Sequence, residues 1–219
     1  MVILDNIWKS YRTQGDEKFV ARGISAVFPT GVSVALLGRN GAGKSTLMRL
    51  IAGTQKPTRG RIWSDGTISW PVGFAGSFHG ELTGAQNVRF VARIYGVDTD
   101  MLSAFVEDFA ELGAHYHLPF RSYSSGMKSR LAFGLSMGIR FDTYLVDEVT
   151  SVGDQRFKEK ASAVFQERVG TSGAIVVSHS MGIIREMCSK AAVLEDGTLK
   201  LYDDVEAGIS HHMENMKHG

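Results

Sequence analysis

The stretch Gly38-Arg39-Asn40-Gly41-Ala42-Gly43-Lys44-Ser45-Thr46 decides the fold of this chain. An apolar run, residues 32–37, leads into it, and apolar residues at helical spacing follow it, which predicts a strand-to-helix turn. Its glycines allow backbone N–H groups to close around phosphate oxygens, and the helix presents its positive end to the same anion. Lys44 is then expected to reach the β- and γ-phosphates, and the Ser45 hydroxyl to bind magnesium. This phosphate loop, residues 38–46, therefore predicts a nucleoside triphosphate site.

Composition limits the partners that this site can serve. The 219 residues are 43% hydrophobic and 21% charged, which suits one α/β domain with an insertion. A net charge of +1, from 24 basic and 23 acidic residues, gives no general field for nucleic acid, so we expect no nucleic-acid partner. The single cysteine, Cys188, excludes an internal disulfide, fits a reducing compartment and is expected to be a buried small hydrophobe. We expect neither a leader nor a spanning helix, so that any work at a membrane needs a partner.

Three pairs of apolar segments predict β-hairpins. Residues 2–8 and 19–28 form the first pair, on either side of a polar segment. The other two hairpins are predicted at Asp-Gly dipeptides, which favour tight turns: Asp65-Gly66 and Asp196-Gly197. Tyr11 ends the first strand of the first pair, where an aromatic ring could stack on a purine or pack against the sheet edge. The residues alone leave both roles open for Tyr11.

The middle of the chain has helical spacing. Residues 86–95 and 99–112 predict two helices of an inserted region. Their apolar side chains are expected to form an internal core more than a partner surface: Phe90, Val91, Phe105 and Phe109. A third helix, to about Ile139, is predicted to begin at Ser124-Ser125-Gly126-Met127. A serine at this position either caps the helix or, with the free N–H groups of the first turn, faces an anion.

Charged and polar residues follow two further apolar strands. One strand, residues 143–146, ends in Asp147 and Glu148; the other, residues 174–177, is followed by Ser178-His179. In a parallel sheet ligands bind at the carboxyl ends of strands, so Asp147 is expected in the magnesium shell and Glu148 beside a water, although a solvated acidic turn at an ordinary strand end would have the same sequence. His179 either has a structural role or donates a hydrogen bond to the terminal phosphate. The histidines near the C-terminus lack metal-ligand spacing and are expected to be tail residues: His211, His212 and His218.

Taken in order, these motifs resemble those of the nucleotide-binding subunit of ATP-binding cassette (ABC) transporters. The series consists of Tyr11, the phosphate loop, Ser124 to Met127, Asp147-Glu148, Ser151-Val152-Gly153-Asp154 and His179, and it covers nearly the whole chain. The resemblance implies an α/β P-loop NTPase fold with a RecA-like core, an antiparallel β subdomain and a helical subdomain inserted at about residues 78–138. The chain, residues 1–219, would then be a single ABC ATP-binding domain.

The resemblance also implies a role for each motif. Tyr11 would stack on adenine, and Asp147 would hold Mg²⁺ together with Ser45. Glu148 would orient the attacking water as general base, and His179 would sense the γ-phosphate. The phosphate loop would bind the triphosphate through Gly38, Arg39, Asn40, Gly41, Ala42, Gly43, Lys44, Ser45 and Thr46. A second copy of the chain would supply Ser124, Ser125 and Gly126, so that two copies close head to tail over two ATP molecules, with residues 151–154 at the seam.

Two departures from the family pattern narrow the subfamily. The signature Leu-Ser-Gly-Gly-Gln is here Tyr123-Ser124-Ser125-Gly126-Met127, and residues 73–84 contain no magnesium-contacting glutamine. Ser77 lies nearest to that position. This loop is similar to that of bacterial capsular polysaccharide exporters and their O-antigen and teichoic acid relatives, and the lack of a long C-terminal extension favours the capsule branch.

The implied protein is a peripheral ATPase subunit at the cytoplasmic face of the inner membrane. It would energise export of capsular polysaccharide through a separate transmembrane permease, docked at residues 74–95, with ATP and Mg²⁺ as its ligands. The alternatives are another exported glycan, such as O-antigen or teichoic acid, or a soluble ABC ATPase without a transporter.

Overall fold

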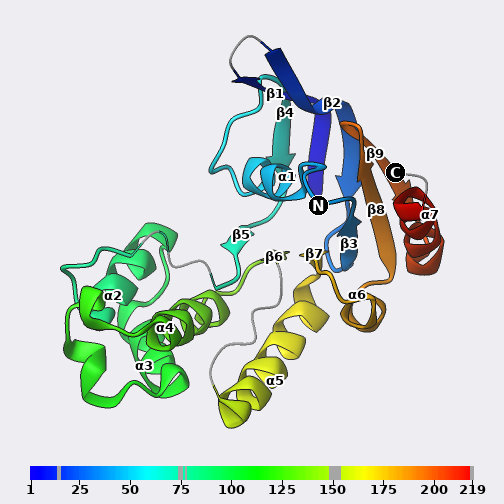
Figure 1. Cartoon of the computed structure of the whole chain (residues 1–219). Coiled ribbons are helices and arrows are strands. Elements are labelled where there is room, and N and C mark those ends of the chain that lie inside the picture. The colour runs from blue at the N-terminus through cyan, green and yellow to red at the C-terminus, as the bar shows by residue number, and fades with distance from the viewer. Residues whose placement is uncertain (14–15, 74–75, 77, 148–153, 218–219) are drawn as a thin grey trace. The chain divides into compact units, whose positions relative to one another are not determined.

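The computed structural model describes residues 1–13, 16–73, 76, 78–147 and 154–217 (Figure 1). The chain divides into two compact units. The first, called the core unit, consists of Met1–Pro71, Phe141–Val149 and Val169–Gly219. The second, called the helical unit, consists of Val72–Arg140 and Thr150–Arg168. The expected insertion at residues 78–138 lies within the helical unit. That residues 1–219 form a single domain remains a prediction.

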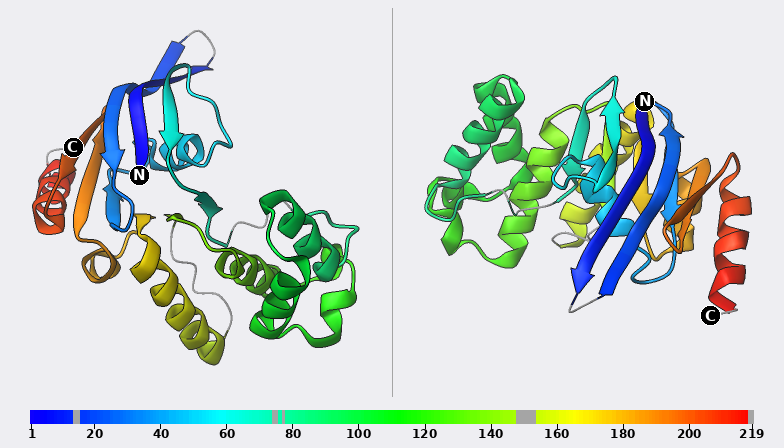
Figure 2. Two further views of the ribbon diagram at one scale, coloured as in Figure 1. Left: turned by 180° about the vertical axis from the view of Figure 1, so that it is seen from behind. Right: turned by 90° about the horizontal axis from the view of Figure 1, so that it is seen from above.

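The core unit contains a three-stranded antiparallel sheet in the order β2-β1-β4. Its strands are β1 (Val2–Thr13), β2 (Asp16–Phe28) and β4 (Arg59–Ser64). The predicted hairpin of β1 and β2 is confirmed, with Val2 opposite Phe28 and Tyr11 opposite Lys18. The strands are longer than expected because the polar residues beyond Tyr11 continue the pairing, and the two long strands run side by side in Figure 2.

A six-stranded sheet in the order β5-β6-β7-β3-β8-β9 forms the rest of the core unit. All neighbouring strands are parallel except β8 and β9, which form the hairpin predicted at Asp196-Gly197. Strand β3 is buried along its whole length, as expected for a central parallel strand covered on both faces. The strands of this sheet are β3 (Val34–Leu37), β5 (Ile68–Pro71), β6 (Thr143–Asp147), β7 (Ala174–Val177), β8 (Lys190–Glu195) and β9 (Thr198–Tyr202). Its helices are α1 (Lys44–Ile51), α6 (Met181–Met187) and α7 (Val205–Lys217).

The hairpin predicted at Asp65-Gly66 is wrong. The strands on either side of this turn, β4 and β5, belong to different sheets. The carboxylate of Asp142 accepts hydrogen bonds from the Thr67 backbone N–H at 2.7 Å and from the Thr67 hydroxyl at 2.8 Å. These contacts fasten the start of β5 beside β6, so the chain leaves the antiparallel sheet after the turn instead of folding back along β4.

The helical unit is built around aromatic side chains. The ring of Phe109 lies 5.9 Å from that of Phe133 and 5.3 Å from that of Phe157, centroid to centroid. Of the four side chains expected in an internal core, Val91 and Phe109 are buried, whereas Phe90 is 53% exposed. The helices are α2 (Gly84–Tyr95), α3 (Thr99–Ala110), α4 (Ser125–Gly138) and α5 (Gln155–Ser172), whose last residues belong to the core unit, with 3₁₀ turns at Gly113–His117 and Phe120–Ser122.

The histidines expected to be tail residues form part of α7, which lies along β8 and β9 (Figures 1 and 2). His211 Nδ1 lies 2.8 Å from the Tyr202 hydroxyl, and His212 is buried. The expectation of a tail was wrong for these two residues because their side chains pack on the sheet. His218 lies outside the described residues. Within the described ranges, no group of three or more His, Cys, Asp or Glu side chains could hold a metal ion.

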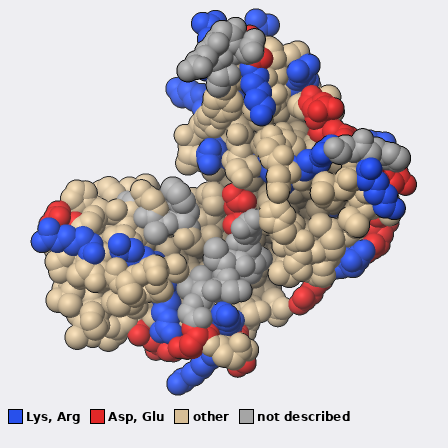
Figure 3. Space-filling view, viewed as in Figure 1, with Lys and Arg blue, Asp and Glu red and all other residues tan. Residues whose placement is uncertain are grey.

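The balance of 24 basic and 23 acidic residues is visible on the surface of the described residues. Basic and acidic side chains are interspersed on the face that Figure 3 shows. None of the helices in the described part of the chain is both long and apolar enough to cross a bilayer.

Candidate nucleotide site

The phosphate loop connects the buried strand β3 to α1, as the sequence predicted. Gly43 precedes the first helical residue with a φ of 109°, which glycine adopts readily. A Cβ atom at this position would lie 2.1 Å from Val20 Cγ1, so the space beside Gly43 is filled by β2. The ammonium group of Lys44 donates hydrogen bonds to the Gly38 carbonyl at 2.6 Å and to the Arg39 carbonyl at 3.0 Å. The positive charge of Lys44 therefore lies against the backbone of the phosphate loop.

A cavity of about 360 Å³ opens on the loop and gathers the candidate ligand-binding side chains of the core unit. Lys44, Ser45 and Thr46 line it at the start of α1, while Asp147 and His179 line it from the ends of β6 and β7. The strand order brings these residues together, since β7 lies between β3 and β6 and all three strands are parallel. The cavity thus combines a cation, two hydroxyl groups, a carboxylate and an imidazole.

Tyr11 lines the same cavity and is held by its hydroxyl group. Gln55 Nε2 donates a hydrogen bond to this hydroxyl at 2.7 Å, and Thr46 Oγ1 lies 3.5 Å away. Burial would raise the pKa of the Tyr11 hydroxyl, but the hydrogen bonds with Thr46 and Gln55 and the charge of Lys9 together lower it below 10.0. The Tyr11 ring therefore lies beside the phosphate loop, with its hydroxyl group hydrogen-bonded, and does more than pack against the edge of the sheet.

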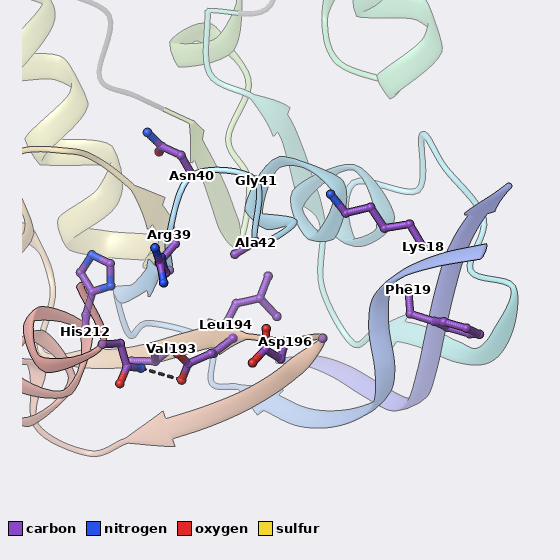
Figure 4. Close-up of a pocket in the computed structure, with 14 residues that line it drawn as sticks. Lys18, Phe19, Arg39, Asn40, Gly41, Ala42, Val193, Leu194, Asp196 and His212 are labelled. Carbon is purple, nitrogen blue, oxygen red and sulfur yellow. Dashed lines mark hydrogen bonds between the residues drawn. The ribbon is translucent and has the colours of Figure 1, made fainter. Parts of the chain in front are cut away.

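A second cavity, of about 420 Å³, shares Lys18, Asn40 and Gly41 with the first and extends along the phosphate loop to Gly38 and Arg39 (Figure 4). Figure 4 shows Arg39 and His212 on one side of it and Lys18 and Phe19 on the other. The wall formed by α7 and β8 is fixed by a hydrogen bond of 2.6 Å from Asn215 to Glu195. Neither Lys44 nor Asp147 lines this cavity, so the smaller cavity is the one that gathers the side chains expected to bind phosphate and magnesium.

The helical unit contains the second predicted anion-facing motif. Ser124 caps α4, its side chain accepting a hydrogen bond from the Met127 N–H at 3.3 Å, and Ser125 is the first helical residue. Ser124 and Gly126 line a cavity of about 360 Å³ together with Arg130. Arg130 donates a 2.8 Å hydrogen bond to Asp154 and lies over the Phe157 ring. Capping and an anion-facing helix start are thus compatible at this site.

Several predicted site residues lie outside the described residues: Glu148, Ser151, Val152, Gly153 and Ser77. Their roles stay predictions. Conversely, no sequence motif points to Lys18 and Val20, which line this cavity, or to Gln55, which contacts Tyr11 in its wall. Their positions depend on the pairing of β1 with β2 and on the path of the chain after α1, neither of which has a short motif.

Comparison of the sequence with known proteins identifies related proteins. The model of the ABC transporter family matches residues 21–151. The polysialic acid transport ATP-binding protein KpsT of Escherichia coli is 48% identical over 215 residues, which cover 97% of this chain and 96% of that protein. The capsule polysaccharide export ATP-binding protein CtrD of Neisseria meningitidis is 44% identical, over 97% of this chain and 98% of that protein.

A solved structure agrees with the fold. The ATP-binding cassette MJ0796, in a dimeric post-hydrolysis state bound to ADP and Pi, superposes with a TM-score of 0.75 over 94% of this chain and 99% of its own, at 20% identity. This similarity confirms the predicted P-loop NTPase fold class. With the full-length similarity to KpsT and CtrD and the match of the family model, it follows that the chain belongs to the ABC transporter family, as an ATP-binding protein.

Proposed function

We propose that this chain is the ATP-hydrolysing subunit of an ABC exporter that moves capsular polysaccharide across the bacterial inner membrane through a separate transmembrane partner. The observation that carries the proposal is the cavity on the phosphate loop, where Lys44, Ser45, Asp147 and His179 line one space in the core unit. The similarity to KpsT and CtrD over nearly the whole chain supports polysaccharide as the substrate. The chain would act at the cytoplasmic face of the membrane, as a peripheral subunit.

ATP binding would use Lys44, Tyr11 and His179, which line one cavity of the core unit, together with Glu148, which lies outside the described residues. The N–H groups of the loop and the positive end of α1 face the triphosphate, and the Lys44 ammonium moves from the Gly38 and Arg39 carbonyls to the β- and γ-phosphate oxygens. The Tyr11 ring stacks on the adenine. His179 donates a hydrogen bond to the γ-phosphate, and Glu148 orients the attacking water and accepts its proton.

The donor set of the cavity fits Mg²⁺, which prefers oxygen ligands. Ser45 and Asp147 supply a hydroxyl and a carboxylate oxygen beside Lys44 and would hold the ion. When bound, Mg²⁺ neutralises charge on the β- and γ-phosphate oxygens. Ser77 is the candidate substitute for the glutamine that the family usually places near the ion.

Two copies of the chain are needed for one complete site in this proposal. Ser124, Ser125 and Gly126 are exposed at the start of α4, where the Met127 and Lys128 N–H groups donate to Ser124, so the N–H groups of Ser125 and Gly126 are the ones placed to meet a phosphate supplied by another molecule. Ser124, Ser125 and Gly126 of one copy would therefore cover the ATP bound to the phosphate loop of the other. ATP binding closes the pair and hydrolysis reopens it, since the γ-phosphate is the group shared by both surfaces.

The proposed dock for the transmembrane partner is the segment of residues 74–95, which carries exposed apolar side chains on α2. Phe90 is 53% exposed and Ile94 is 62% exposed, one helical turn apart. The same segment supplies one partner of each of two ion pairs, Glu81 with Arg121 at 3.0 Å and Arg89 with Asp100 at 3.2 Å. Charge reversal at Glu81 or Arg89 should weaken co-purification with the permease while ATP binding by the isolated chain persists.

The proposal is tested by ATP turnover of the purified chain. The rate should rise with the square of protein concentration where the chain is mostly monomeric, because two copies form the site, and Glu148→Gln should lower turnover by about 100-fold or more while ATP still binds. A rate that is linear in protein concentration throughout would contradict the two-copy site. Capsule export in cells should be lost with the same variant. If expression of the chain restores export of another glycan and not of capsular polysaccharide, the chain belongs to the O-antigen or teichoic acid branch.

A further inference from the structure

The hydroxyl group of Tyr11 is clamped by the side chain of Gln55. Gln55 Nε2 donates to the hydroxyl at 2.7 Å, and the hydroxyl donates to Gln55 Oε1 at 3.1 Å, so the carboxamide contacts it through both of its polar atoms. Thr46 Oγ1, in the first turn of α1, lies 3.5 Å from the same hydroxyl. The tip of the ring is therefore fixed relative to the phosphate loop.

The segment that carries Gln55 is itself fastened at both ends. On the side of α1, the Gln55 backbone N–H and the Thr54 hydroxyl both donate to the Arg49 carbonyl, at 3.2 Å and 3.1 Å. On the side of β1, the Thr58 N–H donates to the Trp8 carbonyl at 2.7 Å. Residues 54–58 thus connect the end of α1 to the strand that bears Tyr11.

One face of the Tyr11 ring has a partner within the chain. The Lys9 ammonium lies over the ring at 5.3 Å from its centroid, and it donates a hydrogen bond to the Lys56 carbonyl at 2.9 Å. A base that stacks on this ring therefore uses the opposite face. The ring is held by its hydroxyl at the tip and by a cation over one face, which leaves little freedom for it to rotate away from the cavity that it lines.

We propose that Gln55 is a positioning residue for the purine base. It holds the Tyr11 ring in the place where adenine can stack on it while the triphosphate lies in the phosphate loop. This inference rests on the proposed ATP site and adds a residue to it. Gln55 itself acts through Tyr11. Without the clamp, each nucleotide that binds would have to order the ring. The clamp orders the ring in advance and so lowers the free-energy cost of ATP binding.

The test compares Gln55→Leu, which keeps the size of the side chain but removes both hydrogen bonds, with the control Thr54→Val in the same segment. Because ATP must then order the freed ring as it binds, the Kd for ATP should rise about three- to tenfold in Gln55→Leu. Thr54→Val should bind ATP like the unmodified chain, because the Gln55 backbone N–H still fastens the segment to the Arg49 carbonyl and Thr54 does not contact Tyr11. Inorganic tripolyphosphate, which has no base, should bind Gln55→Leu and the unmodified chain equally well.

Two further measurements separate positioning from general damage. In a Tyr11→Phe background, which lacks the hydroxyl, Gln55→Leu should cause no additional loss of ATP affinity. The value of kcat at saturating ATP should stay constant in Gln55→Leu while KM rises. Equal ATP affinity of Gln55→Leu and the unmodified chain would overturn the inference, as would an equal loss of tripolyphosphate affinity. Failure of the unmodified chain to bind ATP would instead refute the proposed function itself.

Discussion

Gly43→Ala tests the close packing of β2 against the phosphate loop. The new methyl group would lie 2.1 Å from Val20 Cγ1, far inside the contact distance of about 3.5–4.0 Å between carbon atoms. The residue would also have to adopt a φ of 109°, which is unfavourable for any residue with a Cβ atom. Either the loop or β2 must shift, and the loop is the element that would bind phosphate in the proposed site.

The size of the effect has two separable parts. A left-handed backbone conformation costs a non-glycine residue roughly 1–2 kcal/mol, and forcing a methyl group into filled space costs about 1–3 kcal/mol more. Val20→Ala removes the clashing atom, after which the nearest atoms of residue 20 are its carbonyl oxygen at 3.4 Å and its Cβ at 3.5 Å. In that background Gly43→Ala should cost only the backbone part, about 1–2 kcal/mol.

The assay is urea unfolding of the two single variants, the double variant and the control Gly53→Ala. Gly53 also has a positive φ, 71°, but no atom lies within 4 Å of its added Cβ. We expect Gly43→Ala to destabilise the chain more than Gly53→Ala does, and to lose ATP affinity that Val20→Ala partly restores. Equal destabilisation by the two glycine variants, or additive effects of Gly43→Ala and Val20→Ala, would refute the reasoning.

Three further predictions concern titrating groups. Burial raises the pKa of the Cys188 thiol to about 12, so at about pH 8 iodoacetamide should modify it only after denaturation; rapid modification of the folded chain would contradict its burial. Burial first, and the charge of Lys44 second, lower the pKa of His212 below 6.5, so the stability that this group contributes is complete above pH 6.5 and is lost as the pH falls. Unfolding measured between about pH 7 and about pH 5 should therefore show a weaker pH dependence in His212→Leu than in the unmodified chain. Hydrogen bonds from the Thr67 backbone and hydroxyl lower the pKa of Asp142 below 3.8, which NMR titration of its carboxyl carbon should show, and Thr67→Val should raise that pKa toward the ordinary value.

Local signals in the sequence were sufficient for the phosphate loop and for most elements. The loop is predictable because glycines, a lysine and a serine at fixed spacing suffice to define a strand-to-helix turn. Ser124 was recognised as the start of α4 for a similar reason, since a serine cap acts within one helical turn. Each of these features depends on residues that are neighbours in the chain.

Features that depend on distant residues were missed or wrongly predicted. Asp65-Gly66 is a good local signal for a hairpin, but the hydrogen bonds between Thr67 and Asp142 decide the direction of the next strand. The helix α7 and the packing of His212 depend on β8 and β9, which an isolated C-terminal sequence does not reveal. The role of Gln55 has no local signal because its partner, Tyr11, lies 44 positions earlier in the chain.

The most direct test of the two-copy site mixes two inactive variants. Lys44→Ala removes the phosphate-binding lysine of the core unit, and Gly126→Asp places a charge at the start of α4 that repels phosphate. Each variant alone should be inactive, because both of its sites contain the same defect. A mixed pair contains one site with both defects and one intact site, so an equimolar mixture should regain ATP hydrolysis, to about a quarter of the unmodified rate if pairs form at random. A mixture that stays as inactive as its separate components would contradict a site shared between two copies.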